Sequence, residues 1–265
     1  MRGRYALRIA ALGYLALLLG IPVALVFINA FQDGVGAAWD AVTTPEAQHA
    51  FYLTMVMVAV AVPLNTIFGV LCALAVVRQR FRGRAVLNAL VDLPFAVSPV
   101  VVGLALLLVY GRRDGWVGGW LAEHGIRIIF STPGMILATM FVSLPFVVRE
   151  VIPVLREIGT EQEQAAATLG ANKLQTFFRV TLPAIRWGVA YGVVLTTARA
   201  LGEFGAVSIV SGKLSGQTET ATLFVESEFR RFNETGAYAA SVLLALLALV
   251  TLLAMNLIKP KEART

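Results

Sequence analysis

Two oppositely charged residues lie inside an apolar stretch of the sequence that runs from Ile185 to Val210. Arg199 and Glu203 are four positions apart, so on a helix they share one face and can partly neutralise each other. A charged side chain at the centre of a membrane costs ~2.5–3.5 kcal/mol on the scale derived from insertion experiments, and such residues are functional candidates by default. The pair therefore predicts a polar site within a membrane-spanning segment.

Three roles are open for this pair. In the first, Arg199 contributes positive potential to a pathway for an anion, and Glu203 restrains and orients it. In the second, the two residues form a structural salt bridge that fixes the helix register. The third is a proton relay through Glu203, which ranks lowest because no chain of acids or histidines continues from it.

Three small residues share the helical spacing of the charged pair. Ala198, Gly202 and Ala206 recur at every fourth position. Small residues let two membrane helices approach closely, so we predict that this stripe packs against another helix.

Prolines interrupt two further apolar stretches. Ser98 and Pro99 lie within the stretch from Ala85 to Tyr110, and Arg149 lies beside prolines within the stretch from Met135 to Leu155. A proline inside a helix removes a backbone hydrogen bond, kinks the helix and leaves carbonyl groups that need a protected interior. We assign Ser98, Pro99 and Arg149 to a translocation pathway or gate, with simple packing kinks as the alternative.

The composition indicates an integral membrane protein. Apolar residues make up 58% of the chain and charged residues 14%, a balance far from that of a soluble domain. The net charge of +6 fits the basic cytoplasmic loops of a membrane protein better than a nucleic-acid partner. The single cysteine, Cys72, excludes an intrachain disulfide, and we expect neither a metal site nor catalytic residues.

Six stretches are long and apolar enough to cross the ~30 Å hydrocarbon core as helices. Their apolar runs are continuous rather than alternating, which excludes the strands of a β-barrel. We expect a single all-α domain over residues 1–265, with spans at about residues 9–31, 51–77, 85–110, 135–155, 185–210 and 237–258.

The distribution of basic residues predicts the orientation of the chain. Arginine and lysine gather before the first span, between the second and third, between the fourth and fifth, and after the last, whereas the opposite loops hold most of the acidic residues. By the positive-inside rule, both termini and the loop at about residues 156–184 lie in the cytoplasm.

The loop between the fourth and fifth spans has the signals of a short helix. Residues 161–168 are rich in Glu, Gln and Ala, which favour helices. Thr160 is expected to cap the first turn, with Glu163 at the capping-box position. Gly170 suits the end of this helix, and Pro183 suits the first turn of the next span.

One side of this helix is flat. Ala165 and Ala166 have small side chains, which suits insertion into a cleft of another protein. The alternative is an amphipathic connector that rests on the membrane surface. The segment is acidic and has few large apolar side chains, whereas interfacial helices usually combine Lys or Arg with Trp or Phe. From these residues alone, both roles stay open.

The loop resembles the EAA loop in the membrane subunits of bacterial ATP-binding-cassette (ABC) importers. The family pattern is Glu-Ala-Ala-x-x-x-Gly, nine residues, then Ile-x-Leu-Pro; here Gln164 stands where the family usually has glutamate, and Val180 replaces isoleucine. In that family the loop docks into a cleft of an ATPase subunit, so the resemblance implies the same role here. The residues assigned to ATPase coupling are Glu161, Glu163, Gln164, Ala165, Ala166, Gly170, Leu182 and Pro183.

Residues 93–99, 145–150 and 198–208 look like the sulfate/thiosulfate branch of these importers, and within it like the W-type of its two permeases. The resemblance implies a heterodimer with a T-type permease in the bacterial inner membrane, two cytoplasmic ATPase subunits that bind ATP and Mg²⁺, and a periplasmic sulfate-binding protein. Sulfate would pass between the two permeases by alternating access. The chain has no Gly-x-x-x-x-Gly-Lys-Ser/Thr phosphate loop, so we expect a partner to bind ATP and this chain not to be an enzyme.

Two other transport functions stay open at this point. Molybdate permeases share the core Arg-x-Leu-Gly-Glu-Phe-Gly with residues 199–205, so molybdate or tungstate is an alternative cargo. A secondary transporter driven by an ion gradient would need an intramembrane acid that titrates, for which Glu203 is the candidate. A membrane scaffold with no transport role would leave the paired charges unexplained.

Overall fold

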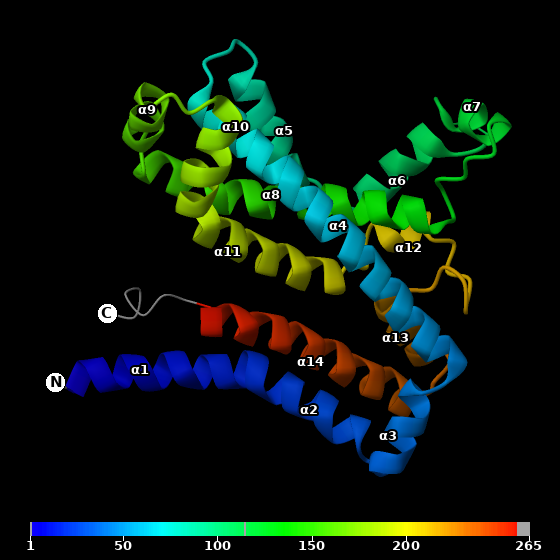
Figure 1. Cartoon of the computed structure of the whole chain (residues 1–265). Helices are drawn as coiled ribbons and strands as arrows, with labels where there is room; N and C mark the ends of the chain where they lie inside the picture. The colour runs from blue at the N-terminus through cyan, green and yellow to red at the C-terminus, as the bar shows by residue number, and fades with distance from the viewer. Residues whose placement is uncertain (1, 114, 259–265) are drawn as a thin grey trace.

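The computed structural model describes residues 2–113 and 115–258 of the 265-residue chain. Every regular element within these residues is helical, so the predicted all-α fold is confirmed. The helices, which Figure 1 labels, are α1 (Arg2–Leu15), α2 (Ile21–Ala30), α3 (Val35–Val42), α4 (Pro45–Arg78), α5 (Arg84–Ala96), α6 (Pro99–Tyr110), α7 (Gly118–Glu123), α8 (Thr132–Glu157), α9 (Glu161–Thr168), α10 (Lys173–Thr176), α11 (Leu182–Leu201), α12 (Val207–Val210), α13 (Ala221–Arg230) and α14 (Glu234–Ile258), with the π-helical turns η1 (Ala16–Gly20) and η2 (Phe177–Thr181).

Four helices among the described residues are long and apolar enough to cross a membrane: Leu7–Ala30, Pro45–Arg78, Thr132–Glu157 and Glu234–Leu253. The helices α5 and α6 pass the same test only together, and they are bent by 115° at the break between them. The 20-residue helix α11 is not among these spans, and it contains Arg186 and Arg199. The six-span count therefore stays a prediction.

Two of the predicted spans differ from the helices that form. The stretch at residues 85–110 is not one kinked helix, because the chain leaves the helix after Ala96 and starts a new one at Pro99. The stretch at residues 185–210 is not continuous either, since α11 ends at Leu201 and a separate short helix, α12, follows. The other four predicted spans correspond to observed helices.

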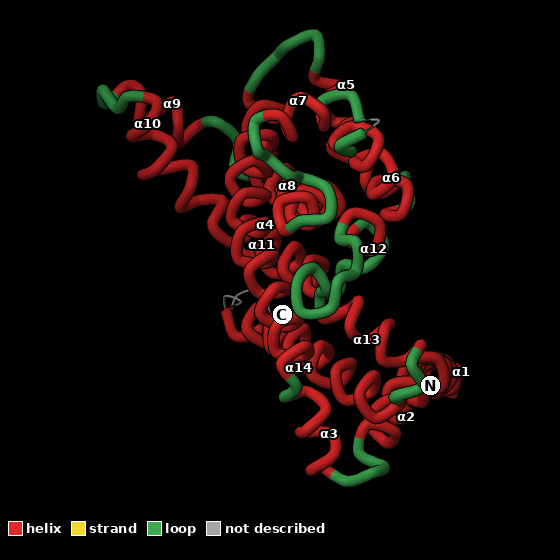
Figure 2. The backbone as a smooth tube through the Cα atoms, turned by 90° about the vertical axis from the view of Figure 1, so that its right-hand side faces the viewer, coloured by secondary structure: helices red, strands yellow, loops and turns green. Residues whose placement is uncertain are grey.

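The two ends of the molecule are distinct. Figure 1 shows the start of α1, the end of α14 and the α9–α10 segment at one end, with α3, α7 and α13 at the opposite end. Figure 2 shows α9 and α10 at the edge of the molecule farthest from α1 and α2. The predicted orientation requires the start of α1, the end of α14 and the loop after α8 to share one end, and this arrangement allows it; the orientation itself stays a prediction.

Glycines let α4, α8 and α11 pack closely at the centre of the fold. A Cβ atom added to Gly69 of α4 would lie 2.7 Å from the Cβ atom of Val147 in α8, and one added to Gly192 of α11 would lie 2.7 Å from the Cα atom of Val147. Small residues of this kind are typical of interfaces between membrane helices. The buried apolar cluster around this contact comprises Val70, Cys72, Ala73, Val76, Val91, Val147, Val148, Val151, Ile152, Leu155 and Ile185.

A buried amide also joins α4 to α8. The Nδ2 group of Asn65 donates to the carbonyl oxygen of Met140 and to the hydroxyl oxygen of Ser143, both at 2.9 Å. A buried amide without partners would cost several kcal/mol, so these bonds fix the register of α4 against α8. The sequence alone predicted no role for Asn65, because its partners come from a distant part of the chain.

We expect Gly192→Val to destabilise the fold by about 1–3 kcal/mol, because the new side chain must displace the backbone of α8 at Val147. Gly202→Ala is the matched control at the end of the same helix, where the nearest atom to an added Cβ is the carbonyl oxygen of Ala198 at 3.9 Å. The measurement is the unfolding temperature of the detergent-solubilised protein, followed by tryptophan fluorescence. Equal unfolding temperatures for the two variants would contradict this packing.

Candidate functional site

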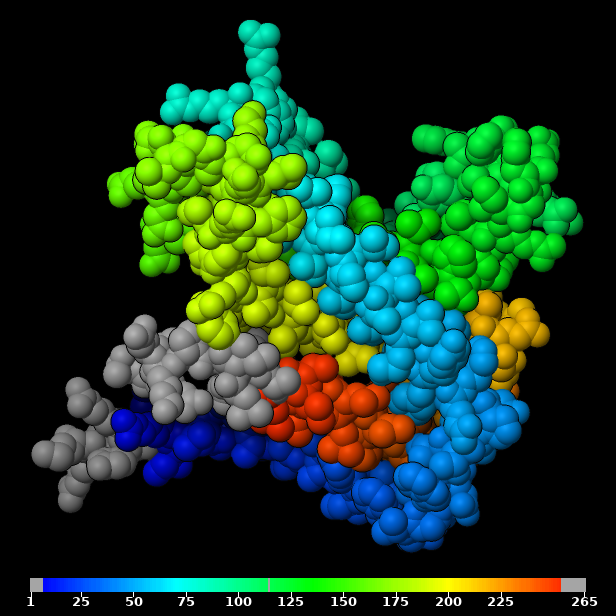
Figure 3. Space-filling view, viewed as in Figure 1, coloured from blue at the N-terminus to red at the C-terminus, as the bar shows by residue number. Residues whose placement is uncertain are grey.

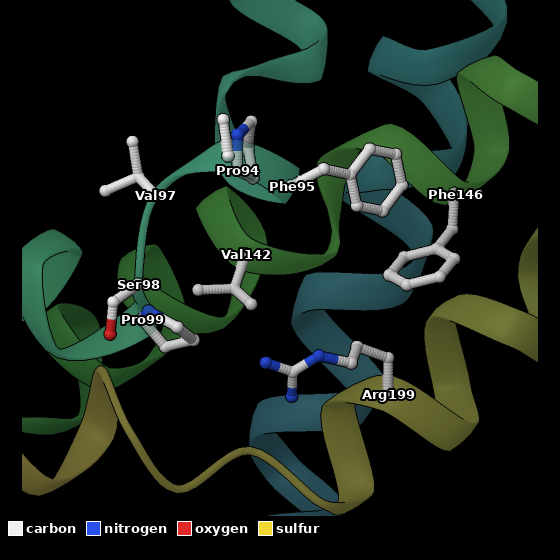
Figure 4. A pocket seen from close by; sticks show the side chains of 9 residues that line it. Pro94, Phe95, Val97, Ser98, Pro99, Val142, Phe146 and Arg199 are labelled. Carbon is white, nitrogen blue, oxygen red and sulfur yellow. The ribbon is translucent and has the colours of Figure 1, made fainter.

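A pocket with a volume of about 290 Å³ lies where α5 gives way to α6. The bend between these helices also opens a notch in the outline of the molecule, between α5 and the α6–α7 segment (Figure 3). The pocket brings together Ser98, Pro99 and Arg199, three of the residues that the sequence analysis assigned to a pathway. Its lining consists of Pro94, Phe95, Ala96, Val97, Ser98, Pro99, Val142, Phe146 and Arg199 (Figure 4).

The break itself follows from the proline. The residue before a proline is disfavoured in the helical region, and Ser98 is accordingly extended, with φ −59° and ψ 136°. Pro99 then starts α6, where a missing N–H costs nothing because no helical acceptor precedes it. The predicted kink is thus a full interruption, with Val97 and Ser98 outside both helices.

Two glycines hold this break against the segment that follows α11. A Cβ atom on Gly103 of α6 would lie 2.8 Å from the carbonyl oxygen of Ala206, and one on Gly205 would lie 2.8 Å from the Cβ atom of Pro99. Side chains at either position would force the two segments apart. The glycines therefore place the break beside Arg199.

The ion pair predicted from the spacing of Arg199 and Glu203 forms. An Nη1 atom of Arg199 lies 2.7 Å from Oε2 of Glu203, whose side chain is only 1% exposed, whereas that of Arg199 is 29% exposed. The Oε1 atom of Glu203 accepts the N–H of Ala206 at 2.9 Å, and its carbonyl oxygen accepts the hydroxyl of Thr222 at 2.7 Å. These bonds fix Glu203, and through it the position of Arg199.

The predicted stripe of small residues does not form. Helix α11 ends at Leu201, and Gly202 is its exposed C-cap. Ala206 is buried, but it lies beyond the helix, directly before α12. The physical reason is that the Glu203 carboxylate takes the N–H of Ala206, which turns the chain out of the helix and starts α12 across α6. Ala198 and Ala206 therefore do not share a helix face.

Arg149 lies outside the pocket lining. It comes from α8, and its guanidinium forms a two-point contact with the carboxylate of Asp92 in α5, with Nε 2.7 Å from Oδ1. This pair ties α5 to α8 one helical turn beyond Phe146, which does line the pocket. Asp92 was not among the residues predicted from the sequence, although a lone acid in an apolar stretch is a signal that could have identified it.

Of the residues assigned to ATPase coupling, five lie in α9, Gly170 lies in the turn that follows, and Leu182 and Pro183 begin α11. We call residues 161–181, which include α9, α10 and η2, the coupling segment. Gly170 has φ +85°, a backbone conformation that favours glycine, directly after α9 as predicted. Thr160 does not cap α9, which corrects the predicted capping box. Glu163, the other member of that box, instead accepts the hydroxyl of Thr181 at 2.9 Å and pairs with Arg78.

Arg78, at the end of α4, holds the coupling segment to the helical core. Its Nε group donates to the Glu163 carboxylate at 3.1 Å, while its Nη groups donate to the carbonyl oxygens of Leu155 at 3.0 Å and Gly159 at 2.5 Å. One side chain thus joins α4, the end of α8 and the start of α9. The sequence analysis used Arg78 only as one of the basic residues that set orientation.

The coupling segment continues into α11 without a break. The N–H of Leu182 bonds to the carbonyl of Phe177, five residues earlier, which is the π-helical pattern. This wider turn directly precedes Pro183, which has no backbone N–H to donate the next hydrogen bond. Helical structure therefore runs from Lys173 to Leu201, a length of about 40 Å at 1.5 Å per residue, and Arg199 lies at its far end.

Large apolar side chains project from the coupling segment. Leu169, Leu174 and Phe178 are 89%, 70% and 61% exposed. Gln164 and Ala165 are exposed beside them, and the Nε2 group of Gln164 donates to the Thr160 hydroxyl at 3.0 Å. An exposed apolar group with a polar border is typical of a surface that another protein covers.

We expect Arg78→Gln to loosen the coupling segment, because hydrogen bonds to charged groups contribute about 1.5–3 kcal/mol and four of them are lost or weakened. Amide hydrogen exchange of residues 159–181 should accelerate about tenfold or more. Arg80→Gln, an exposed arginine two residues further on, is the matched control and should leave the exchange unchanged. The same exchange rate in both variants would refute the anchoring role of Arg78.

Comparison with known proteins shows which family this chain belongs to. The family model described as "Binding-protein-dependent transport system inner membrane component" matches residues 65–264. The "Sulfate transport system permease protein CysW" of Synechocystis sp. is 52% identical over 258 residues, which cover 97% of this chain and 93% of that protein. The "Sulfate transport system permease protein CysT" of Synechococcus elongatus is 39% identical, over 95% of this chain and 90% of that protein.

A solved structure has the same fold. It is described as a bacterial alginate ABC transporter in complex with alginate pentasaccharide-bound periplasmic protein, and it matches 98% of this chain and 95% of its own with a TM-score of 0.80 at 19% identity. At that identity the likeness concerns the fold alone. On the family match and the relatives together, this chain belongs to the inner membrane components of binding-protein-dependent transport systems, and its fold is that of an ABC importer permease.

Proposed function

We propose that this chain is the W-type permease subunit of an ATP-driven importer that carries sulfate, and thiosulfate as a related cargo, across the bacterial inner membrane. The observation that carries the proposal is the 52% identity to a sulfate permease over 97% of the chain. That coverage includes the pocket, the ion pair and the coupling segment. An arginine at the only charged position of the pocket lining supports an anionic cargo.

The proposed complex is a heterodimer with a T-type permease, served by a periplasmic binding protein and two cytoplasmic ATPase subunits. The 39% identity to a T-type relative supports a pseudo-symmetric partner of the same fold. The matched importer structure, which includes a periplasmic protein, supports a separate carrier for substrate capture. ATP and Mg²⁺ belong to the ATPase subunits, and this chain performs no catalysis itself.

The coupling segment is the proposed contact with an ATPase subunit. Its exposed surface comprises Glu161, Gln164 and Ala165, together with the apolar Leu169 of the following turn. Because Arg78 and the continuous helix into α11 hold this segment firmly, closure of the ATPase dimer would move α11 as one body. The substitution of the usual glutamate by Gln164 keeps the shape of the docking helix while it removes one charge.

The orientation and span count belong to the same proposal. With the coupling segment in the cytoplasm, both termini lie there too, which the shared end of the molecule in Figure 1 supports. Helix α11 then serves as the fifth of six spans and the bent α5–α6 pair as the third. Arg199 is tolerable in a membrane because it pairs with Glu203, and the exposed Arg186 lies near the start of α11, next to the coupling segment.

The translocation pathway follows the pocket. Arg199 and Glu203 provide its fixed charges, Ser98 and Pro99 form its bend, and Arg149 holds α5 to α8 through Asp92. A movement of α11 would shift Arg199 relative to the bend, which is the physical basis of alternating access in this subunit.

We expect the wild-type gene to restore ATP-dependent uptake of radiolabelled sulfate in cells that lack this subunit. Ala165→Asp should reduce uptake at least tenfold while the complex still assembles in the membrane, because an unpaired charge buried in an interface costs about 2–5 kcal/mol. Ala165→Ser, which keeps the side chain small and neutral, is the matched control and should transport normally.

Normal uptake by Ala165→Asp would contradict the docking role of the coupling segment. Uptake that persists without the ATPase subunits and follows the proton gradient would contradict the importer assignment. Uptake of molybdate with no uptake of sulfate would contradict the proposed cargo.

A further inference from the structure

We propose that the pocket at the α5–α6 break is a binding site for a tetrahedral oxyanion, which sulfate occupies briefly on its way through the permease. The identity of the cargo rests on the proposed function, and the proposal adds a defined place where this chain touches the anion. The orientation of the ion pair, the supply of donors and the size of the pocket support it.

The Arg199–Glu203 pair presents its positive end to the pocket. Arg199 lines the pocket, and its guanidinium points toward Ser98 and Pro99 (Figure 4). Glu203 is not part of the lining, and its buried carboxylate is held by the N–H of Ala206. Although the pair has no net charge, its dipole is fixed, so an anion in the pocket meets the guanidinium at shorter range than the carboxylate.

Hydrogen-bond donors of Arg199 and Ser98 belong to the lining of the same pocket. A guanidinium has five N–H donors, more than the contact of Nη1 of Arg199 with Oε2 of Glu203 can engage. The Ser98 hydroxyl forms no capping bond to α6. Helix α6 begins at Pro99 of the lining, and in its first turn the N–H groups of Val100 and Val101 have no acceptor within the helix and carry positive potential. A tetrahedral oxyanion has only acceptor atoms, so these donors complement it.

The geometry suits brief rather than tight binding. A transport site must bind its ion strongly enough to admit it and weakly enough to release it. Glu203 partly neutralises Arg199, which prevents the anion from binding too tightly to be released. The volume of about 290 Å³ compares with a share of about 30 Å³ for one water molecule in the liquid, so the anion can keep part of its hydration shell.

The other arginine of this region does not fit the role. Arg149 is outside the lining, and both carboxylate oxygens of Asp92 engage its guanidinium. A two-point contact of this kind uses the face that an oxyanion would need. The oxyanion site is therefore assigned to Arg199 alone.

The test uses charged thiol reagents on the assembled importer in proteoliposomes, with partner subunits free of cysteine. Cys72 is the only cysteine of this chain, so Cys72→Ala with Ser98→Cys leaves one thiol, at the pocket. The measured quantity is the ratio of labelling rates with an anionic and a cationic methanethiosulfonate. The same thiolate attacks both reagents and displaces methanesulfinate from each, so the ratio cancels changes in the thiol's own reactivity and reports local potential.

We expect the ratio of anionic to cationic labelling to fall about tenfold when Arg199→Gln is combined with Glu203→Gln, because local potential changes reagent concentration by about tenfold or more. The double change avoids a buried unpaired carboxylate. Sulfate should slow labelling when Arg199 and Glu203 are present, and it should have no effect when both are replaced by glutamine. Ser215→Cys, in the exposed loop after α12, is the matched control, and its ratio should not respond to either change.

An unchanged ratio at position 98 would overturn the oxyanion site. If the complex imports sulfate but sulfate does not slow labelling at position 98, the oxyanion site is overturned and the proposed function stands. Protection by molybdate in a complex that does not import sulfate would support the site and overturn the sulfate cargo.

Discussion

The structure depends on one side chain, Arg78, which joins three helices at the end of the molecule that carries the coupling segment. Its guanidinium binds the carboxylate of Glu163 and two carbonyl oxygens at the end of α8, so α4, α8 and α9 cannot move independently there. A mostly buried arginine that donates from all three guanidinium nitrogens is strongly directional, because its planar donors need partners in fixed places. The short helix α9, which buries no residue of its own, takes its position from this contact.

A continuous helix extends this constraint to the pocket. Helical structure runs from Lys173 through the π turn and α11 to Leu201, with Arg199 in the last turn. The pocket's other wall, the α5–α6 break, is held by close contacts at Gly103 and Gly205. The last part of the coupling segment and the proposed oxyanion site therefore lie at opposite ends of one continuous helix, which the Thr181 hydroxyl joins to Glu163 of α9. A displacement of the coupling segment would move Arg199.

Local signals in the sequence predicted the residues of the site better than their arrangement. The spacing of Arg199 and Glu203 predicted their ion pair, and it forms although the helix has ended by Glu203, because one turn of chain suffices to bring them together. Pro99 predicted a kink, but the chain leaves the helix entirely and bends by 115°, where Gly103 and Gly205 allow close contact with the segment after α11. The capping box at Thr160 failed because Glu163 is engaged by Arg78, a tertiary partner that no local pattern contains.

The most direct test of this account is the number of sulfate ions imported per ATP hydrolysed by the reconstituted complex that carries Arg78→Gln. If the coupling segment transmits ATPase closure through its attachment to α4 and α8, ATP hydrolysis should persist while sulfate import per ATP falls several-fold below wild type. An unchanged ratio, with both activities normal or both reduced equally, would contradict the claim that this attachment couples the ATPase to the pathway.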